Sequence, residues 1–435
     1  MTQRSASAPG PTPTPGATAR NDQTAPLLDL AALDLDALAA RVRVWLDDHL
    51  PREWRAAALA GDPRALAAIA GDRAVTGAWY AELGRSGLAT PGWPVRNGGL
   101  GLAADAAAVV ADELANLSAG RPEEDFVGIA LAGPTIIEWG TPTQHERFLP
   151  PLARGEHLWC QLFSEPGAGS DLAGLTTRAV ARDDGTWLVN GQKVWSSYSD
   201  RADFGLLMAR TDPALPKHGG ISYFLLDMRT PGVEVRPLRQ LNGESEFGEV
   251  FLTDVVVADS DRLGPVNRGW QVAITTLMAE RSGLTGRPGV GPGRADELAE
   301  RARRTGAWDD PVLRDQLLRA FVSERVLQMA TVRAFVDLGS REPGPEGSIR
   351  KLAKAQLDVT LGMLATEVEP GGAAAVADSD PDGVAAAHAF LSAKRLSIAG
   401  GTSEIQRNII GERVLGLPRD RDPHADLPFQ DRPRG

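Results

Sequence analysis

The sequence contains little cysteine and histidine, and this scarcity excludes several kinds of site. Its one cysteine, Cys160, has no partner for a disulfide within the chain and cannot form a multi-cysteine metal site. The six histidines are scattered, and no two show the HxxxH spacing that places two metal ligands on one helix face. We therefore expect no internal disulfide and no bound metal.

Positive charge and long apolar runs are also lacking. Lysine and arginine total 46 against 57 aspartate and glutamate residues, which gives a formal net charge of -11. Such an acidic chain lacks the general attraction to phosphate that nonspecific nucleic-acid binding needs, so we expect no nucleic-acid partner. The sequence has no run of about 18 apolar residues, so it predicts no membrane-spanning helix.

The first residues are rich in Pro, Ser, Thr and Ala and have no apolar stretch of the kind found in a secretory signal. We interpret residues 1–26 as a disordered leader and residues 421–435 as a tail. Since neither an export signal nor a membrane span is apparent, we expect a cytoplasmic protein.

Between these ends, the sequence pattern changes twice. From 27 to 156, segments such as "AADAAAVVADELANL" carry apolar residues at three- and four-residue spacing, which predicts helices. From 157 to 265, short runs such as "TWLVNGQKVWSS" and "FGLLMAR" lie between Gly, Asp and Pro turns and predict strands. Helical spacing returns from 266 to 420. The chain is therefore expected to form a helical, a β and a second helical domain.

A pair of glycines stands out in "SIAGGTSEIQRNIIGERVLGLPR". Gly400 and Gly401 precede Ser403 and Gln406, whose spacing fits a capping box and predicts a helix starting there. The helix would bury three isoleucines, Ile405, Ile409 and Ile410. A helix N-terminus presents unpaired N–H groups, which suit a phosphate, a carboxylate or an electron-rich carbonyl. Neither glycine can move a proton, so a reactive side chain must lie elsewhere.

A second glycine-rich segment is "WCQLFSEPGAGSDLAGL", residues 159–175. Gly167 and Gly169 would let a ligand approach main-chain N–H groups, and Ser164 and Ser170 would add hydroxyl donors. A Pro-Gly turn between a helix and a strand is the simpler interpretation, and glycine content alone favours it.

A third segment, "VNGQKVWSS", has the Asn190-Gly191 pair typical of a hairpin turn. Trp195, Ser196 and Ser197 follow, and an aromatic ring beside two hydroxyls can stack on a flat heterocycle and hydrogen-bond to it. A Trp in a strand is, however, more often part of a core.

Taken together, five ordered segments resemble the acyl-CoA dehydrogenase family: "FSEPGAGSDLAGLTTRA", "NGQKVWSS", "EFGEVFLTDVVV", "GWQVAITTLMAER" and "AGGTSEIQRNIIGERVLGLPR". The resemblance covers residues 27–419. It implies an α+β, mostly helical fold with an N-terminal helical domain, a middle β-barrel-like domain and a C-terminal four-helix bundle. It also implies FAD as cofactor, bound between the last two domains and across a subunit interface.

The resemblance implies a reaction in which a carboxylate removes the proton α to a thioester while the β-carbon delivers hydride to the flavin. In many members the base is a Glu at the position that Gly400 occupies here. A second placement in the family is a Glu-Arg pair on the helix after the β-domain, and Glu280 and Arg281 match it. Glu280 would share a largely apolar helix face, so that burial raises the pKa of its carboxyl. The alternative is a solvated or structurally paired Glu.

Other positions carry roles implied by the same resemblance. Gly400, with Gly401 beside it, would supply an N–H to the thioester oxygen, together with the ribityl 2′-OH of the flavin. Arg281 and Ser170 match positions on the acyl-CoA side. Trp195 also matches the place where an electron-transfer flavoprotein would reach the flavin. The positions that match cofactor contacts are Gln161, Phe163, Ser164, Gly169, Ser170, Trp195, Ser196, Ser197, Thr402 and Glu404.

The segments "DPVLRDQLLRAFVSERVLQM" and "GPEGSIRKLAKAQ" resemble an actinobacterial branch of the family that acts in the breakdown of sterols and other bulky acyl groups. Some members of this branch are heterotetramers, so a homo- or heterotetramer, or a dimer, is expected. Two alternatives to an acyl-CoA dehydrogenase remain open. One is a non-catalytic partner subunit of a heteromeric enzyme, and the other is a flavin oxidase or monooxygenase that uses a carrier-bound acyl group.

Overall fold

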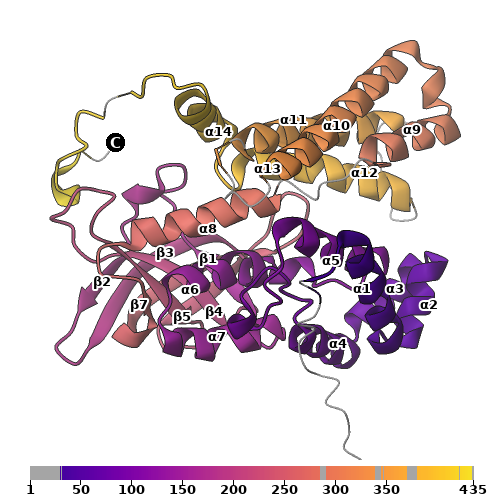
Figure 1. The fold of residues 1–435 in the computed structure, drawn as a ribbon. Helices are drawn as coiled ribbons and strands as arrows, with labels where there is room; N and C mark the ends of the chain where they lie inside the picture. Colours follow the sequence, from indigo (N-terminus) through magenta and orange to yellow (C-terminus); the bar gives the residue numbers. More distant parts are fainter. Residues whose placement is uncertain are drawn as a thin grey trace, which may run out of the picture.

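The computed structural model describes residues 30, 32–284, 291–338, 344–345, 347–369, 380–420 and 422–433, with backbone only for 281–284 and 335–338. The leader predicted for residues 1–26 lies outside this part of the chain. A helical N-terminal region, a sheet and a second helical region follow one another, which confirms the α+β, mostly helical class (Figure 1).

Several of the N-terminal helices begin where a short polar side chain caps them. Asp34, Asp62 and Asp72 each accept backbone N–H bonds at a helix start, and Thr141 forms a capping box with Gln144. The helices are α1 (Leu35–His49), α2 (Arg52–Ala60), α3 (Pro63–Gly71), α4 (Arg73–Ser86), α5 (Ala104–Asn116), α6 (Gly133–Trp139) and α7 (Pro142–Ala153). A π-helical turn, Val127–Ala132, precedes α6.

Eight strands form one sheet in the order β6-β7-β3-β2-β4-β5-β8, and β1 pairs in parallel with β4. They are β1 (Trp159–Leu162), β2 (Arg178–Ala181), β3 (Thr186–Ser197), β4 (Phe204–Arg210), β5 (Ile221–Asp227), β6 (Val233–Leu238), β7 (Phe247–Ala258) and β8 (Arg262–Leu263). The pairs β2–β3, β4–β5 and β6–β7 are antiparallel, as connections between consecutive strands allow, and β3–β7 is antiparallel as well.

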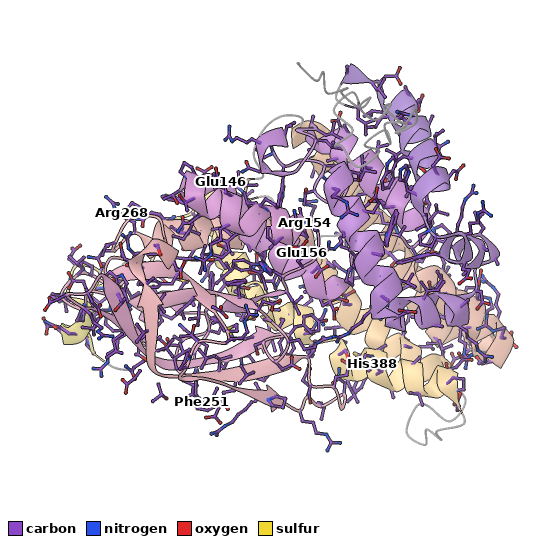
Figure 2. All side chains as sticks on the ribbon, turned by 90° about the horizontal axis from the view of Figure 1, so that it is seen from below. Glu146, Arg154, Glu156, Phe251, Arg268 and His388 are labelled. Atoms are coloured by element: carbon purple, nitrogen blue, oxygen red, sulfur yellow. The ribbon has the colours of Figure 1, made fainter. Side chains whose placement is uncertain are left out.

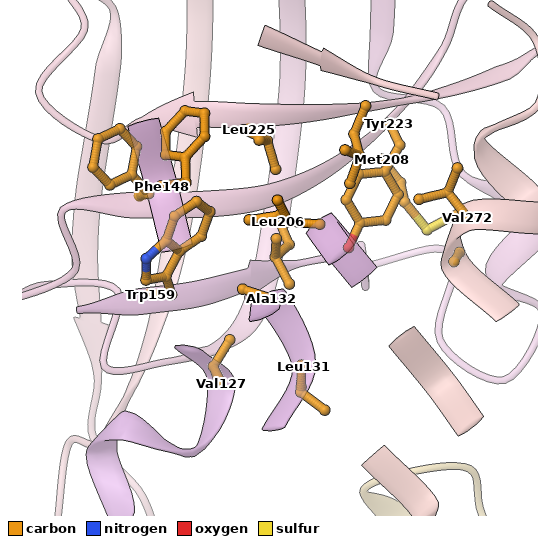
Figure 3. Packing of buried hydrophobic residues seen from close by; sticks show 14 of the residues in the cluster. Val127, Leu131, Ala132, Phe148, Trp159, Leu206, Met208, Tyr223, Leu225 and Val272 are labelled. Atoms are coloured by element: carbon orange, nitrogen blue, oxygen red, sulfur yellow. The ribbon is translucent and has the colours of Figure 1, made fainter. Parts of the chain in front are cut away.

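Strand β4 is buried along its whole length because its two faces belong to two different cores. Leu206 and Met208 pack with Tyr223 of β5 and Val272 against the neighbouring helices (Figure 3). Leu207 and Ala209 point to the opposite face, where they join the interior of the curled sheet. A continuous apolar run in a strand is what such two-sided burial requires.

The Asn190-Gly191 hairpin turn predicted from the sequence is wrong, because β3 runs straight through both residues. Its pairing with β7 shifts register between Val189 and Gly191, which marks a bulge. The Asn190 side chain donates to Asp254 Oδ1 across the strands at 3.0 Å. A Cβ at position 191 would lie 2.3 Å from Thr177 Oγ1, so the glycine permits close packing rather than a turn.

The C-terminal helices are α8 (Gly269–Leu284), α9 (Arg294–Thr305), α10 (Pro311–Leu338), α11 (Gly347–Val368), α12 (Pro381–Ser392), α13 (Arg395–Ile398) and α14 (Ser403–Ile409). Helix α8 lies along the sheet and contacts both β5 and α11 (Figure 1). On the other side of the region, His388 Nε2 of α12 lies 3.0 Å from Glu244 Oε1 in the β6–β7 loop (Figure 2). The sheet therefore contacts the C-terminal helices at two separate places.

The tail returns to the sheet region (Figure 1). The Phe429 N–H donates to Leu215 O at 2.8 Å, and the Arg210 guanidinium lies 3.7 Å from the centre of the Phe429 ring. Arg210 is buried, and it donates in turn to Ala173 O at 2.6 Å. The tail therefore covers a side chain that supports the loop after β1.

Candidate active site

Strand β1 and the loop that follows it carry five of the predicted site residues, and the loop carries one buried charge. Gln161 is half-buried in β1 and Phe163 is buried just after it. Ser164 O accepts the Val194 N–H at 2.9 Å, which ties the loop to β3. Gly169 and Ser170 lie further along the loop, where both are near or at the surface. A Cβ at Gly169 would meet no atom within 4 Å, so packing within the chain does not require a glycine there.

A buried ion pair fixes this loop against β3. Lys193 Nζ donates to Glu165 Oε1 at 2.9 Å and to Phe163 O at 3.0 Å, and the Lys193 side chain is fully buried. Burial alone would raise the pKa of Glu165, but the charge of Lys193 and hydrogen bonds from Thr177 and Thr176 outweigh it and lower this pKa to about 2. Neither partner is recognisable from the sequence, because a charged residue gives no sign there of being buried.

The Trp195 segment at the end of β3 is unusual in both backbone and exposure. Trp195 has φ of 61° and is 61% exposed, although a Trp in a strand would ordinarily be part of a core. Its neighbour Ser196 is fully buried, and its Oγ has no hydrogen-bond partner among the described residues. Ser197 is half-buried and pairs with Phe247 of β7. An exposed ring held in a strained conformation, next to an unpaired buried hydroxyl, fits a flat polar ligand.

Helix α8 places Glu280 one turn beyond a hydrogen-bond network that joins it to the sheet. The Tyr223 hydroxyl lies 3.0 Å from Thr276 Oγ1, and Thr276 is fully buried. The Tyr223 ring contacts Phe163 edge to face, with ring centres 5.7 Å apart. Glu280 itself is half-buried, as its position beside the apolar helix face predicted. The side chain of Arg281 lies outside the described residues.

The glycine turn, defined here as residues 399–402, has a left-handed backbone. Gly400 has φ of 62° and Gly401 has φ of 89°, conformations that favour glycine. The predicted capping box is wrong, because Thr402 rather than Ser403 is the N-cap and accepts the Ile405 N–H at 3.3 Å. The helix begins at Ser403, so the capping side chain is the residue before it.

The last helix differs from prediction in two further respects. Its isoleucines Ile405, Ile409 and Ile410 are half-buried rather than buried. Gln406 is the fully buried side chain of this helix because its amide turns inward toward the glycine turn. Glu404 is exposed and pairs with Arg407 at 3.2 Å, so its side chain faces solvent.

Lys351 of α11 links the glycine turn to the helix that carries Glu280. Its Nζ donates to Gly401 O at 2.6 Å and to Leu396 O at 2.7 Å. Burial lowers the pKa of Lys351, and the charges of Glu280 and Glu404 oppose that shift. The structure therefore brings Glu280 into the same electrostatic environment as the glycine turn, although the two lie 120 residues apart in sequence (400 minus 280).

The two halves of the site are also bridged from the sheet side. Arg395 Nη1 of α13 donates to Glu246 Oε1 at 2.8 Å, and Glu246 O accepts the Tyr198 N–H at 2.7 Å. Tyr198 directly follows the Trp195 segment, and Arg395 lies in the short helix that leads into the glycine turn. The predicted residues thus form two groups, one on the sheet and one on α8 and the glycine turn, joined by Phe163–Tyr223–Thr276 and by Arg395–Glu246.

These groups fit a bound flavin. The exposed Trp195 ring, the unpaired buried Ser196 hydroxyl and the open approach to Gly169 are the features that stacking, hydrogen bonding and backbone access would require. Within the described ranges, no group of three or more His, Cys, Asp or Glu side chains could hold a metal ion, and no helix is long and apolar enough to cross a membrane. A helix–sheet–helix protein with such a platform and a half-buried carboxylate has the architecture of a flavin-dependent oxidoreductase.

Comparison with known proteins agrees with this architecture. Three family models match the chain: the N-terminal domain of acyl-CoA dehydrogenases at 34–156, the middle domain at 160–255 and the C-terminal domain at 267–415. The chain belongs to the acyl-CoA dehydrogenase family, whose members are FAD-dependent oxidoreductases.

Among curated relatives, the acyl-CoA dehydrogenase IpdE1 of Mycobacterium tuberculosis is 39% identical over 89% of this chain and 99% of its own length. The acyl-CoA dehydrogenase FadE34 of the same organism is 42% identical over 78% of this chain, but the match covers 46% of FadE34. A solved structure of the ChsE4–ChsE5 complex from Mycobacterium tuberculosis matches with a TM-score of 0.67 and 29% identity, over 89% of this chain and 98% of that chain.

Proposed function

We propose that the protein catalyses the α,β-dehydrogenation of an acyl-CoA thioester to the trans-2-enoyl-CoA, with Glu280 as the catalytic base. The observation that carries the proposal is that Lys351 binds Gly401 O at 2.6 Å on a helix, α11, that contacts α8, and that the charge of Glu280 acts on the pKa of Lys351. A base and a set of carbonyl-facing donors are the two groups that abstraction of a thioester α-proton needs.

Each group has a separate task in this reaction. The Glu280 carboxylate removes the α-proton, and its half-buried position limits the water that would compete for that proton. The N–H of Gly400 hydrogen-bonds to the thioester oxygen and stabilises the negative charge that develops there. Trp195, Ser196 and Ser197 hold the flavin, with Phe163 and Thr402 beside it. Bound FAD supplies the hydride acceptor for the β-carbon.

The resemblance to the branch that acts on sterols and other bulky acyl groups supports a bulky acyl-CoA as the substrate class. The ChsE4–ChsE5 complex, a structural relative, joins two named proteins, which supports assembly with a second subunit. An exposed apolar stripe along one face of α10 supports the same assembly: Leu318 48%, Val322 58%, Val326 59% and Met329 60% exposed. We propose that this stripe packs against another subunit and that an electron-transfer flavoprotein reoxidises the flavin beside the exposed Trp195.

Flavin bleaching tests this function. The FAD-loaded protein is mixed anaerobically with straight-chain, branched and steroid-like acyl-CoA thioesters, and the loss of oxidised-flavin absorbance is followed. We expect at least one bulky thioester to bleach the flavin, and Glu280→Gln to slow bleaching by roughly a thousandfold or more while FAD stays bound. Glu146→Gln, which changes an exposed residue of α7 that is not among the proposed site residues, is the matched control.

Other outcomes separate the alternatives. Bleaching at an unchanged rate in Glu280→Gln would remove Glu280 from the role of base. A colourless, inert chain that gains activity only with a second subunit would identify a partner subunit instead of a complete enzyme. Oxygen consumption with peroxide release during turnover would identify an oxidase.

A further inference from the structure

Lys351 is a buried lysine that has no direct task in the proposed reaction. Its side chain is fully buried, and burying an ammonium group is costly unless several acceptors surround it. The two acceptors are main-chain oxygens, Leu396 O at 2.7 Å and Gly401 O at 2.6 Å, and they stand on either side of Gly400. The lysine thus ties the glycine turn, at Gly401, to the short helix α13 that precedes it, at Leu396.

Gln406 holds the same turn from the other side. Its Nε2 donates to Gly400 O at 3.0 Å and to Gly401 O at 3.1 Å. The opposite amide orientation would place Oε1 against two carbonyl oxygens, so the nitrogen must face the turn. The fully buried Gln406 leaves Oε1 with no partner among the described residues. The amide nitrogen of Gln406 thus binds two carbonyls while its buried oxygen has no partner in the described part of the chain, an arrangement that costs stability.

The glycine turn needs such support because it has no side chains of its own. Left-handed φ values at Gly400 and Gly401 place the turn in a region where glycine is free to move. A peptide group is planar, so its C=O and N–H point in opposite directions. Fixing Gly400 O therefore directs the Gly401 N–H, and fixing Gly401 O directs the Thr402 N–H. The Gly400 N–H belongs to the preceding peptide, which lies in sequence between the held Leu396 and Gly400 oxygens. In the described part of the chain, the Gly400 and Gly401 N–H groups donate to no acceptor, which leaves both available to a ligand.

We propose that Lys351 and Gln406 are positioning residues that hold the glycine turn so that its N–H groups bind the thioester oxygen, and that the Lys351 ammonium helps to stabilise the enolate formed there. The inference rests on the proposed acyl-CoA dehydrogenation. Donors fixed in advance stabilise developing charge without the cost of reorienting during the reaction. A positive charge on one end of a hydrogen-bonded peptide also polarises that peptide further.

Enolate formation by bound acetoacetyl-CoA tests this role without chemistry at Glu280. Acetoacetyl-CoA ionises at its α-carbon, and donors that bind its thioester oxygen lower the pKa of that ionisation. The FAD-loaded wild-type protein, Lys351→Met and Gln406→Met are titrated with pH while the enolate absorption is recorded. The matched controls on helix α11 are Lys354→Met and Gln356→Met, which lie at its less buried positions.

We expect wild type to lower the pKa of bound acetoacetyl-CoA, and each test variant to raise it by about one unit, roughly a tenfold loss of enolate stabilisation. The controls should match wild type, and Lys351→Arg, which keeps the charge and several donors, should recover most of the effect. A wild-type shift that both Met variants retain in full would overturn the inference and leave the proposed function intact. A wild type that neither shifts this pKa nor bleaches with any acyl-CoA would overturn the proposed function itself.

If Lys351→Met loses FAD, the enolate pKa measured in Gln406→Met and Gln406→Glu tests the positioning role. Gln406→Glu places two acceptor oxygens against the carbonyls and should raise the enolate pKa at least as much as Gln406→Met. An unchanged enolate pKa in these FAD-loaded variants would overturn the positioning role.

Discussion

Tyr223 and Thr276 join the sheet to helix α8 through hydroxyl oxygens that lie 3.0 Å apart. Thr276 Oγ1 is also 3.0 Å from Thr135 Oγ1 of α6, so one buried hydroxyl connects β5, α6 and α8. Glu280 follows Thr276 by one helical turn, and Phe163 packs edge to face on the Tyr223 ring. This network therefore sets the position of the proposed base relative to the loop that would bind the flavin.

The first prediction concerns this network. Thr276→Val should lower the free energy of unfolding by about 2 to 3 kcal/mol, because it leaves the buried hydroxyls of Tyr223 and Thr135 without a shared partner. Tyr223→Phe should cost about 1 kcal/mol, since Thr276 keeps its bond to Thr135. Urea denaturation of the apoprotein measures both, with Tyr198→Phe at a half-buried position as the control. Equal effects of the two variants would contradict the shared-partner account.

The second prediction concerns the Glu165–Lys193 pair and pH. The pKa of Glu165 lies near 2, below its ordinary value of 4.5. The pair therefore contributes stability that is fully present above about pH 5 and is lost as the pH falls from about 5 toward 2. Glu165→Gln should lower the free energy of unfolding by about 3 kcal/mol near neutral pH because Lys193 is left buried without a counter-charge. The difference from wild type should shrink by about 2 kcal/mol between pH 5 and pH 3.

Urea titrations at several pH values measure that difference. Asp315→Asn, which breaks an exposed pair with Arg319, should change stability by less than about 1 kcal/mol at every pH. A Glu165→Gln deficit that stays constant with pH would show that the carboxylate charge does not stabilise the fold.

Much of the fold follows from sequence periodicity. The runs "TWLVNGQKVWSS" and "FGLLMAR" coincide with β3 and β4, because alternating or continuous apolar patterns depend on local geometry. The Asn190-Gly191 error has a tertiary cause, since pairing with β7 and contact with Thr177 override the local preference for a turn. Local preference is a weak guide where long-range pairing satisfies the backbone.

The candidate site was predictable to a smaller extent. Family motifs indicated Glu280, Gly400 and Trp195, but they did not indicate the residues, such as Lys351, whose side chains support these positions. Lys351 stands in a run with other cations, "IRKLAK", and three-dimensional packing alone buries it while its neighbour Lys354 stays partly exposed. Supporting residues of this kind act through contacts between distant segments, and a pattern along one chain does not encode them.

The third prediction concerns the strained Trp195. The left-handed φ costs a bulky residue about 1 to 2 kcal/mol, and Trp195→Gly should remove that strain. The greater chain entropy of glycine in the unfolded state opposes this gain. The free energy of unfolding of the apoprotein should therefore change by less than about 1 kcal/mol. FAD affinity should fall roughly tenfold or more with loss of the ring. Flavin fluorescence titration measures the affinity. Ser118→Gly, at an exposed position with φ of 51°, should leave FAD binding unchanged. Unchanged affinity in Trp195→Gly would remove Trp195 from the flavin site.

The fourth prediction tests whether the position of the base is fixed by the backbone. The family resemblance implies a Glu as the base at the position of Gly400 in other members, but φ of 62° makes a side chain there cost about 1 to 2 kcal/mol in this chain. We expect Gly400→Glu to lower the free energy of unfolding by that amount. In a Glu280→Gln background it should restore less than about a tenth of the wild-type bleaching rate, because the carboxylate would be attached to a backbone turned for N–H donation.

Gly306→Glu supplies the matched comparison for that variant. Gly306 ends helix α9 with φ of 83°, and a Cβ there would meet no atom within 4 Å. Gly306→Glu should lower the free energy of unfolding by a similar amount, about 1 to 2 kcal/mol, through backbone strain alone. It should leave flavin bleaching at the wild-type rate. Full recovery of bleaching in Glu280→Gln/Gly400→Glu would mean that the glycine turn accepts a base as readily as α8 does. The left-handed backbone would then not be the reason that the carboxylate lies on α8.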